Sequence, residues 1–165
     1  MHDQSKNREV RMQIKGLFMD PLNRMPIVML VDQKGESLLP IWIGMAEASA
    51  IAMQLENVQP PRPMTHDLLH NVIESLNARL QKVVVHDLQD NTFYAILVLQ
   101  TGEDIVIVDA RPSDAIALAL RFNAPIYVHE RVLMEARTID LHESAESVQQ
   151  WLENMEPEDF GKYQV

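Results

Sequence analysis

The chain has 165 residues, 47% of them hydrophobic, which is enough for one domain with a substantial core and too few for two full domains. It contains no cysteine, and this excludes disulfides, thiolate metal sites and a cysteine nucleophile. The net charge of -10 argues against binding nucleic acid over a broad cationic surface, because neutralised phosphates supply most of that affinity.

The N-terminal residues 1–8 are polar and lack the apolar segment of a secretory signal. No apolar run reaches the roughly 18 residues that a membrane helix needs. The sequence therefore predicts a soluble, cytoplasmic protein that does not span a membrane.

Three strands and a helix are predicted before residue 57. Polar and apolar residues alternate from Glu9 to Lys15, the pattern of a half-buried strand, and the strand continues to residue 19. Apolar segments at 26–31 and 38–43 predict two further strands, and the alanine-rich segment 46–56 favours a helix. Antiparallel hairpins followed by a helix are the simplest arrangement of this part of the chain.

A proline-rich connector, residues 57–64, leads into the next predicted helix. Its prolines exclude a helix or a central strand. Thr65 is a candidate N-cap for a helix over residues 66–79. Apolar residues at helical spacing define the face that we expect to be buried, namely Leu69, Val72, Ile73 and Leu76.

The start of this helix, His66-Asp67-Leu68-Leu69-His70, is similar to the HExxH zinc motif, with aspartate in place of glutamate. The two histidines share a helical face, and Glu74 lies one further turn along. Because the apolar stripe leaves His70 and Glu74 in solvent, a solvated helix face is the favoured interpretation. A zinc site is the alternative.

The second half of the chain repeats the order of the first. Strands are predicted at 83–86, 92–99 and 105–108, with a tight turn at Asp90-Asn91, and a buried helix is predicted at 113–122. The segment 105–108 is entirely β-branched and apolar, which predicts a buried strand.

An offset of 65 positions aligns residues 41–43 with 106–108 and residues 50–53 with 115–118. This match suggests an internal βββα duplication. A short strand at 124–128, one or two helical turns at 130–136 and an acidic amphipathic helix at 140–155 complete the predicted elements.

Polar side chains gather between the strand ending at residue 108 and the buried helix that follows. They are Asp109, Arg111, Ser113 and Asp114. Pro112 disfavours helix at the preceding residue, so the helix is expected to begin at Ser113 or Asp114. Glu47 lies near the start of the corresponding helix of the first half. Two interpretations remain open: a functional site at a strand-to-helix crossover, or ion pairs and caps that only stabilise the fold.

Several motifs taken together resemble the bifunctional nuclease family over about residues 9–136. They are Leu39-Pro40-Ile41-Trp42-Ile43-Gly44 with Glu47-Ala48, residues 60–69, Phe93-Tyr94-Ala95, residues 109–121 and Pro125-Ile126-Tyr127-Val128. The chain departs from the family pattern at Trp42, where a smaller aliphatic residue is usual.

The resemblance implies an α+β fold, with mixed, mainly antiparallel sheets and packed helices. It implies a nuclease that acts on DNA and RNA and forms homo-oligomers. Residues 1–136 are expected to form the nuclease-like domain, and residues 137–165 an acidic amphipathic C-terminal helix and tail.

Phosphodiester hydrolysis needs charge stabilisation at the phosphate and an activated water, for which divalent metals on carboxylates are the usual device. We therefore expect Asp109, Asp114 and Glu47 to approach one another and hold Mg²⁺ or Mn²⁺. The candidate general base is His66, whose type titrates near neutral pH. The candidate substrate-binding residues are Arg111 and Arg62, which would contact phosphate oxygens, together with Ser113 and Thr65.

Two rival functions remain open. In the first, the motif residues form a structural ion-pair network, and the protein is a binding or regulatory module. In the second, it is a hydrolase of small molecules that acts on esters and not on polynucleotides.

Overall fold

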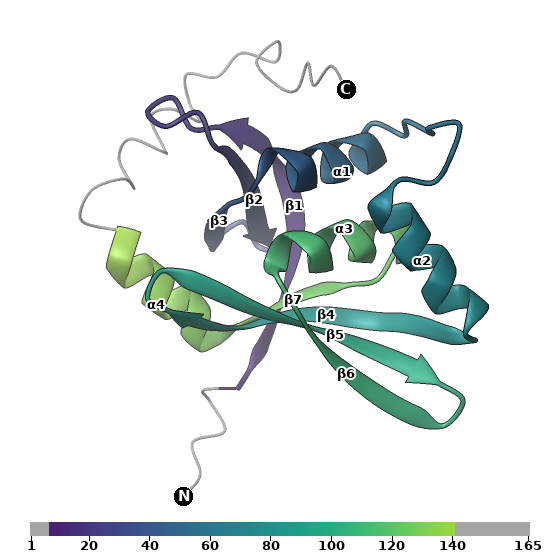
Figure 1. Ribbon diagram of the computed structural model, residues 1–165. Coiled ribbons are helices and arrows are strands. Elements are labelled where there is room, and N and C mark those ends of the chain that lie inside the picture. The colour runs from purple at the N-terminus through teal and green to yellow at the C-terminus, as the bar shows by residue number, and fades with distance from the viewer. Residues whose placement is uncertain (1–6, 141–165) are drawn as a thin grey trace, which may run out of the picture.

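A computed structural model describes residues 7–140, with side chains through residue 136. Within this range seven strands form one mixed sheet in the order β3-β2-β1-β7-β4-β5-β6 (Figure 1). The strands are β1 (Glu9–Met19), β2 (Pro26–Asp32), β3 (Leu38–Trp42), β4 (Ala78–Gln89), β5 (Thr92–Thr101), β6 (Asp104–Ala110) and β7 (Ile126–His129). The helices are α1 (Met45–Leu55), α2 (Thr65–Ser75), α3 (Pro112–Phe122) and α4 (Glu130–Asp140). The predicted α+β fold is confirmed.

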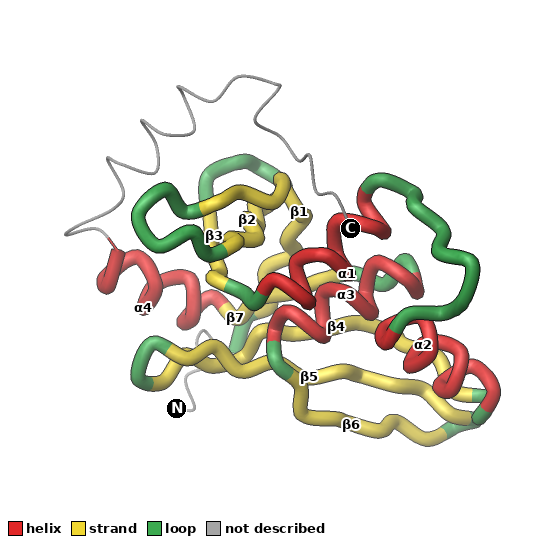
Figure 2. Tube along the Cα trace, turned by 45° about the horizontal axis from the view of Figure 1, so that its top comes forward, coloured by secondary structure: helices red, strands yellow, loops and turns green. Residues whose placement is uncertain are grey.

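The two halves of the sheet have the same topology. β1, β2 and β3 form an antiparallel meander followed by α1, and β4, β5 and β6 form another followed by α3. This order matches the βββα arrangement expected from the sequence offset. β7 lies between the halves, antiparallel to β1 and parallel to β4. The two corresponding helices, α1 and α3, pack against each other (Figures 1 and 2).

The turns follow from residues that tolerate a left-handed backbone. Asp90 and Asn91 both have positive φ, 48° and 61°, which is the conformation of a tight hairpin turn between β4 and β5. Asn77, with φ of 57°, reverses the chain from α2 into β4. α2 therefore ends at Ser75, four residues before its predicted end at 79, and β4 begins at Ala78.

Both predicted helix caps are wrong by one or two residues. α3 begins at Pro112 with Arg111 as its N-cap, because proline fits the first helical turn, where its missing N–H costs nothing. α2 begins at Thr65 with Met64 as its N-cap. The N-terminus of α2 is capped by a side chain of its own first turn, because the Met64 N–H donates to Oδ2 of Asp67 at 2.9 Å.

The hydrophobic core is centred on α3, as predicted. Ala115, Ala117 and Ala119 are at most 1% exposed, and their small side chains allow close approach of the neighbouring helices and strands. Ile116 and Leu118 are likewise fully buried. Because these five apolar side chains are closely packed, this helix provides a rigid base for the polar residues at its N-terminus.

Two burial predictions are wrong. β6 is one of the two edge strands of the described sheet, and Ile105 and Ile107 are 54% and 55% exposed. On α2, Leu69, Val72 and Leu76 are exposed, whereas His66 is buried. Of the four apolar residues predicted to be buried on α2, only Ile73 belongs to the core. The other three, like Ile105 and Ile107, are accessible from the surface.

The amphipathic segment predicted at 140–155 lies outside the described residues. The assignment of residues 137–165 to a separate C-terminal helix and tail stays a prediction. No helix among the described residues is long and apolar enough to cross a bilayer.

Candidate active site

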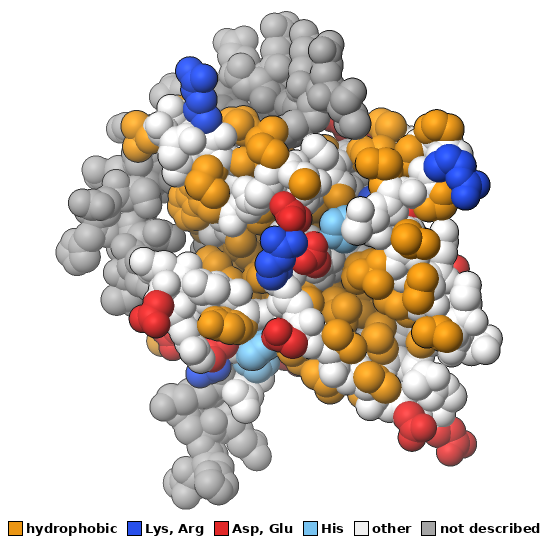
Figure 3. Space-filling view, viewed as in Figure 1, with side chains coloured by type: hydrophobic (Ala, Val, Ile, Leu, Met, Phe, Trp, Pro, Cys, Tyr) orange, Lys and Arg blue, Asp and Glu red, His pale blue; other side chains and the backbone are white. Residues whose placement is uncertain are grey.

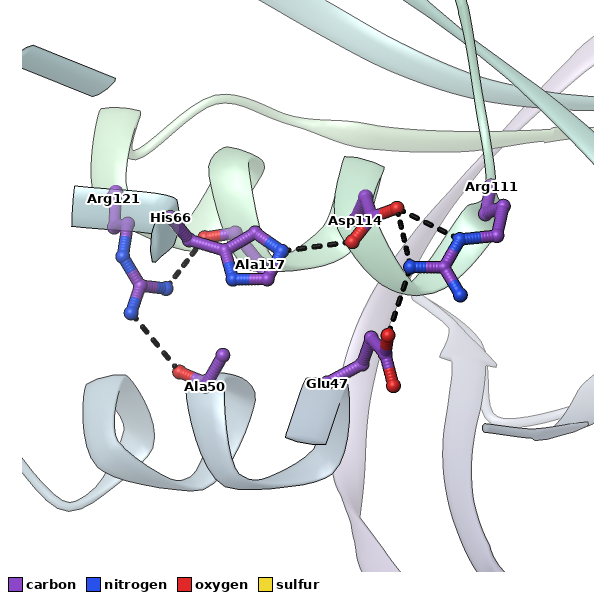
Figure 4. A network of polar contacts seen from close by, with 7 residues as sticks. All are labelled: Glu47, Ala50, His66, Arg111, Asp114, Ala117 and Arg121. Carbon is purple, nitrogen blue, oxygen red and sulfur yellow. Dashed lines mark hydrogen bonds and ion pairs between the residues drawn. The ribbon is translucent and has the colours of Figure 1, made fainter. Parts of the chain in front are cut away.

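Arg111 joins the two halves of the molecule at the N-termini of α1 and α3 (Figure 4). Its Nη2 lies 2.8 Å from Oε1 of Glu47 on α1 and 2.8 Å from Oδ2 of Asp114 on α3. Its Nε also donates to Oδ2 of Asp114, at 2.9 Å. Of the residues predicted to gather here, Glu47, Arg111 and Asp114 are therefore in direct contact.

His66 completes this network from a third helix, α2. Its Nε2 lies 2.8 Å from Oδ1 of Asp114, so that carboxylate is shared between His66 and Arg111. The His66 side chain is 11% exposed, whereas the Arg111 side chain is 65% exposed. A sheltered imidazole and an accessible guanidinium thus lie on opposite sides of one carboxylate.

The position of Glu47 depends on Gly44, the N-cap of α1. A Cβ atom at residue 44 would overlap Oε2 of Glu47, so glycine leaves the space into which this carboxylate folds.

The hydrogen bond from Arg111 holds the pKa of Glu47 below its ordinary value. In turn, Glu47 and Asp114 raise the pKa of the Arg111 guanidinium. Glu47 and Arg111 are therefore both charged at neutral pH.

A second ion pair, which sequence reasoning missed, lies behind the first. Nε of Arg121 on α3 donates to Oδ1 of Asp67 on α2 at 2.7 Å. The same guanidinium donates to the carbonyls of Ala117 at 2.9 Å and Ala50 on α1 at 3.2 Å. Burial raises the pKa of Asp67, but the Met64 N–H and Arg121 lower it by more. The sequence signal that could have revealed this pair is Arg121, a basic residue in the last turn of the mostly apolar helix α3.

The charged network lies at one end of a groove of about 860 Å³. Asp109, at the end of β6, and Thr65, at the start of α2, line it beside Glu47, His66, Arg111 and Asp114. Apolar side chains from α1, α2, α3 and the β5–β6 hairpin form most of the remaining lining. In Figure 3 the charged side chains form a cluster bordered by a broad apolar surface.

Two of the predicted substrate-binding residues lie elsewhere. Ser113 is 6% exposed and does not line the groove. Arg62 lines a separate hollow of about 450 Å³, together with Arg121 and His70. His70 packs against the Phe122 ring, with ring centroids 4.2 Å apart. Thus only His66 of the two histidines at helical spacing belongs to the site.

The predicted metal set does not fit a cation as the side chains are arranged. The guanidinium of Arg111 already lies between the carboxylates of Glu47 and Asp114. Among the described residues, no three histidine or acidic side chains form a group that could hold a metal ion. Asp109 lines the same groove, and its role as a ligand stays a prediction.

The fold and this site define an α+β domain in which three helices bring one charged network to the mouth of an apolar groove. The chain belongs to the bifunctional nuclease domain family, whose model matches residues 28–140. An uncharacterised protein of Mycobacterium tuberculosis strain H37Rv is 39% identical over 164 residues, covering 92% of this chain and 97% of the relative.

Plant relatives share less of their length. Bifunctional nuclease 1 of Oryza sativa subsp. japonica is 27% identical over 109 residues, covering 64% of this chain and 33% of the rice protein. Bifunctional nuclease 2 of Arabidopsis thaliana is 29% identical over 107 residues, covering 63% of this chain and 32% of the relative. The similarity to proteins named as nucleases therefore lies within about a third of their sequences.

Proposed function

We propose that this protein is a nuclease that hydrolyses phosphodiester bonds of DNA and RNA. The observation that carries the proposal is the shared carboxylate of Asp114, which holds His66 on one side and Arg111 on the other. Membership of the bifunctional nuclease domain family supports the choice of phosphodiesters among anionic substrates.

Arg111 would bind the phosphate. Its Nε and Nη2 are held by Asp114 and Glu47, while Nη1 has no hydrogen-bond partner among the side chains that the structure describes. The side chain is also the most exposed member of the network. A guanidinium fixed in this way presents N–H groups to a phosphate oxygen and stabilises the negative charge that grows in the transition state.

His66 would act as the general base. Because the Asp114 carboxylate can only accept, Nε2 of His66 carries the proton of their hydrogen bond, and Nδ1 of the neutral ring is left with a lone pair. Nδ1 can take a proton from water as the water oxygen bonds to phosphorus and the P–O ester bond breaks. Asp114 is then a positioning residue, which fixes the tautomer of the base.

A requirement for Mg²⁺ or Mn²⁺ is also proposed, and its support is the nuclease family rather than the geometry. Such an ion stabilises charge on the phosphate in many nucleases. The predicted ligands are Glu47, Asp109 and Asp114, and a cation could reach this set only if Arg111 left its position between Glu47 and Asp114. Phosphate binding by Arg111 and proton transfer to His66 need no atom of the ion.

The second candidate function is a binding or regulatory module. It is favoured by the pairing of the network, in which Glu47 and Asp114 are both neutralised by Arg111. In this case the network would stabilise the contact between α1 and α3, and its loss would unfold the protein without a specific loss of catalysis.

Cleavage of labelled DNA and RNA by the purified full chain tests the proposal. Arg111→Ala should lower kcat/KM on the order of 100-fold, the usual effect of removing one donor to a developing oxyanion. Arg11→Ala removes the same charge from an exposed position on β1 and should leave cleavage unchanged. The module would be favoured if the wild type did not cleave in Mg²⁺ or Mn²⁺, or if Arg111→Ala were already unfolded at the assay temperature. Activity that persists in EDTA would contradict the metal requirement.

We also propose homo-oligomers in a cytoplasmic location. The oligomer is supported by the apolar edge strand β6, because exposed edges of this kind are usually paired or covered. Light scattering should give a multiple of the chain mass, and Ile107→Lys should lower it to that of one chain. A wild-type monomer would contradict the prediction.

A further inference from the structure

We propose that the groove binds one unpaired nucleotide, with its phosphate on Arg111 and its base against the apolar part of the groove. The protein would therefore act on single strands and not on duplexes. This inference rests on the proposed nuclease function and names the substrate class of the same site.

The charged side chains of the groove can bind one phosphate group. Arg111 is the only lysine or arginine among its lining residues, whereas Glu47, Asp109 and Asp114 contribute three carboxylates. A duplex presents two phosphate backbones, with about one charge per 1.7 Å of helix axis, and is bound through several cations. Neighbouring phosphates of a duplex would meet carboxylates here, so the lining favours a single phosphate at Arg111.

The rest of the groove offers contact to an apolar face. We define the aliphatic wall as the groove residues of α2 and of the β5–β6 hairpin that carry only hydrocarbon side chains: Leu69, Ile73, Leu97, Leu99, Val108 and Ala110. Leu97 and Val108 are paired across β5 and β6, while Leu69 faces the groove from α2. Leu69 and Val108 are 41% and 38% exposed, so this surface is accessible.

An unpaired base suits such a wall. The faces of a base in a duplex are covered by its neighbours, whereas an unpaired base can place one face on a side chain and remove apolar area from water. The wall has no hydrogen-bonding side chain and so cannot read base edges. The base would be bound without sequence preference.

Binding to three fluorescent probes of one length tests this inference at fixed low salt; the two single-stranded probes have the same number of phosphates, and the duplex has twice as many. The probes are a single-stranded oligonucleotide, the same strand in a duplex, and a strand of abasic residues. We expect the single strand to bind about tenfold more tightly than the other two, comparable to the contribution of one stacked base in single-strand binders. Equal binding of the abasic strand, or of the duplex, would overturn the inference.

Two consecutive leucines of α2 provide matched variants. Leu69 lines the groove, whereas Leu68, 56% exposed, does not. Leu69→Gln should remove the preference for the base-bearing strand, and Leu68→Gln should retain it. If Leu69→Gln does not melt cooperatively, the binding of the wild type to the three probes still decides whether the inference holds.

Cleavage is measured separately. Selective binding without cleavage would contradict the proposed nuclease function, and cleavage of duplex and single strand at equal rates would contradict this inference alone.

Discussion

Replacing His66 by glutamine should lower the rate of nucleic acid cleavage by roughly 100- to 10,000-fold, the contribution of a general base. The amide nitrogen of glutamine can occupy the position of Nε2 and donate to Asp114, so the contact between α2 and α3 is kept. What is lost is the lone pair of Nδ1. Initial rates on a labelled oligonucleotide measure the effect, and the melting temperature shows whether the fold is retained.

His70→Gln is the matched control for this variant. His70 lies one turn further along α2, contacts the Phe122 ring and lines the separate hollow beside Arg121. Its replacement should leave the cleavage rate within about twofold, because the residue does not contact the groove. Equal activities of His66→Gln and wild type would contradict the assigned role of His66.

Replacing Arg121 by leucine should lower the free energy of unfolding by roughly 3 kcal/mol, the cost of removing one partner from a buried ion pair. The Arg121 side chain is only 5% exposed. Its loss leaves the Asp67 carboxylate unpaired in a partly buried position, and the carbonyls of Ala50 and Ala117 lose a donor. Urea denaturation followed by circular dichroism measures the change.

Arg111→Leu provides the comparison for stability, because Arg111 also pairs with carboxylates but is 65% exposed. Exposed ion pairs contribute about 1 kcal/mol or less, so this variant should stay close to the wild type. The double variant Arg121→Leu/Asp67→Asn should recover part of the loss, since it removes the unpaired charge. Similar destabilisation by Arg121→Leu and Arg111→Leu would contradict this assignment.

The sequence predicted the element order because local signals agree with the fold. Asp90 and Asn91 favour a hairpin turn with positive φ, and the alanine-rich helices need a buried position. The expectation that Asp109, Asp114 and Glu47 approach one another came from the two equivalent crossovers, and Glu47 and Asp114 are joined through Arg111. Their metal and catalytic roles stay predictions.

What could not be predicted is which apolar surface faces the core. Residues 105–108 have the composition of a central strand, and nothing local distinguishes it from an exposed edge. The orientation of α2 depends likewise on its neighbours: the Arg121–Asp67 pair and the His66–Asp114 contact hold the polar start of the helix inward. Leu69 consequently faces the groove, and the periodicity of the helix alone assigns it to the core.

β7 is near the end of the described chain, yet it occupies the middle of the sheet. Each meander can form from hairpins between adjacent segments, whereas β7 pairs with β1, which was synthesised at the other end of the protein. During translation, β1 and β4 therefore expose unpaired edges until residues 126–129 leave the ribosome. The groove residues are all made earlier, but the sheet that supports them closes only when β7, the last strand of the described residues, is added.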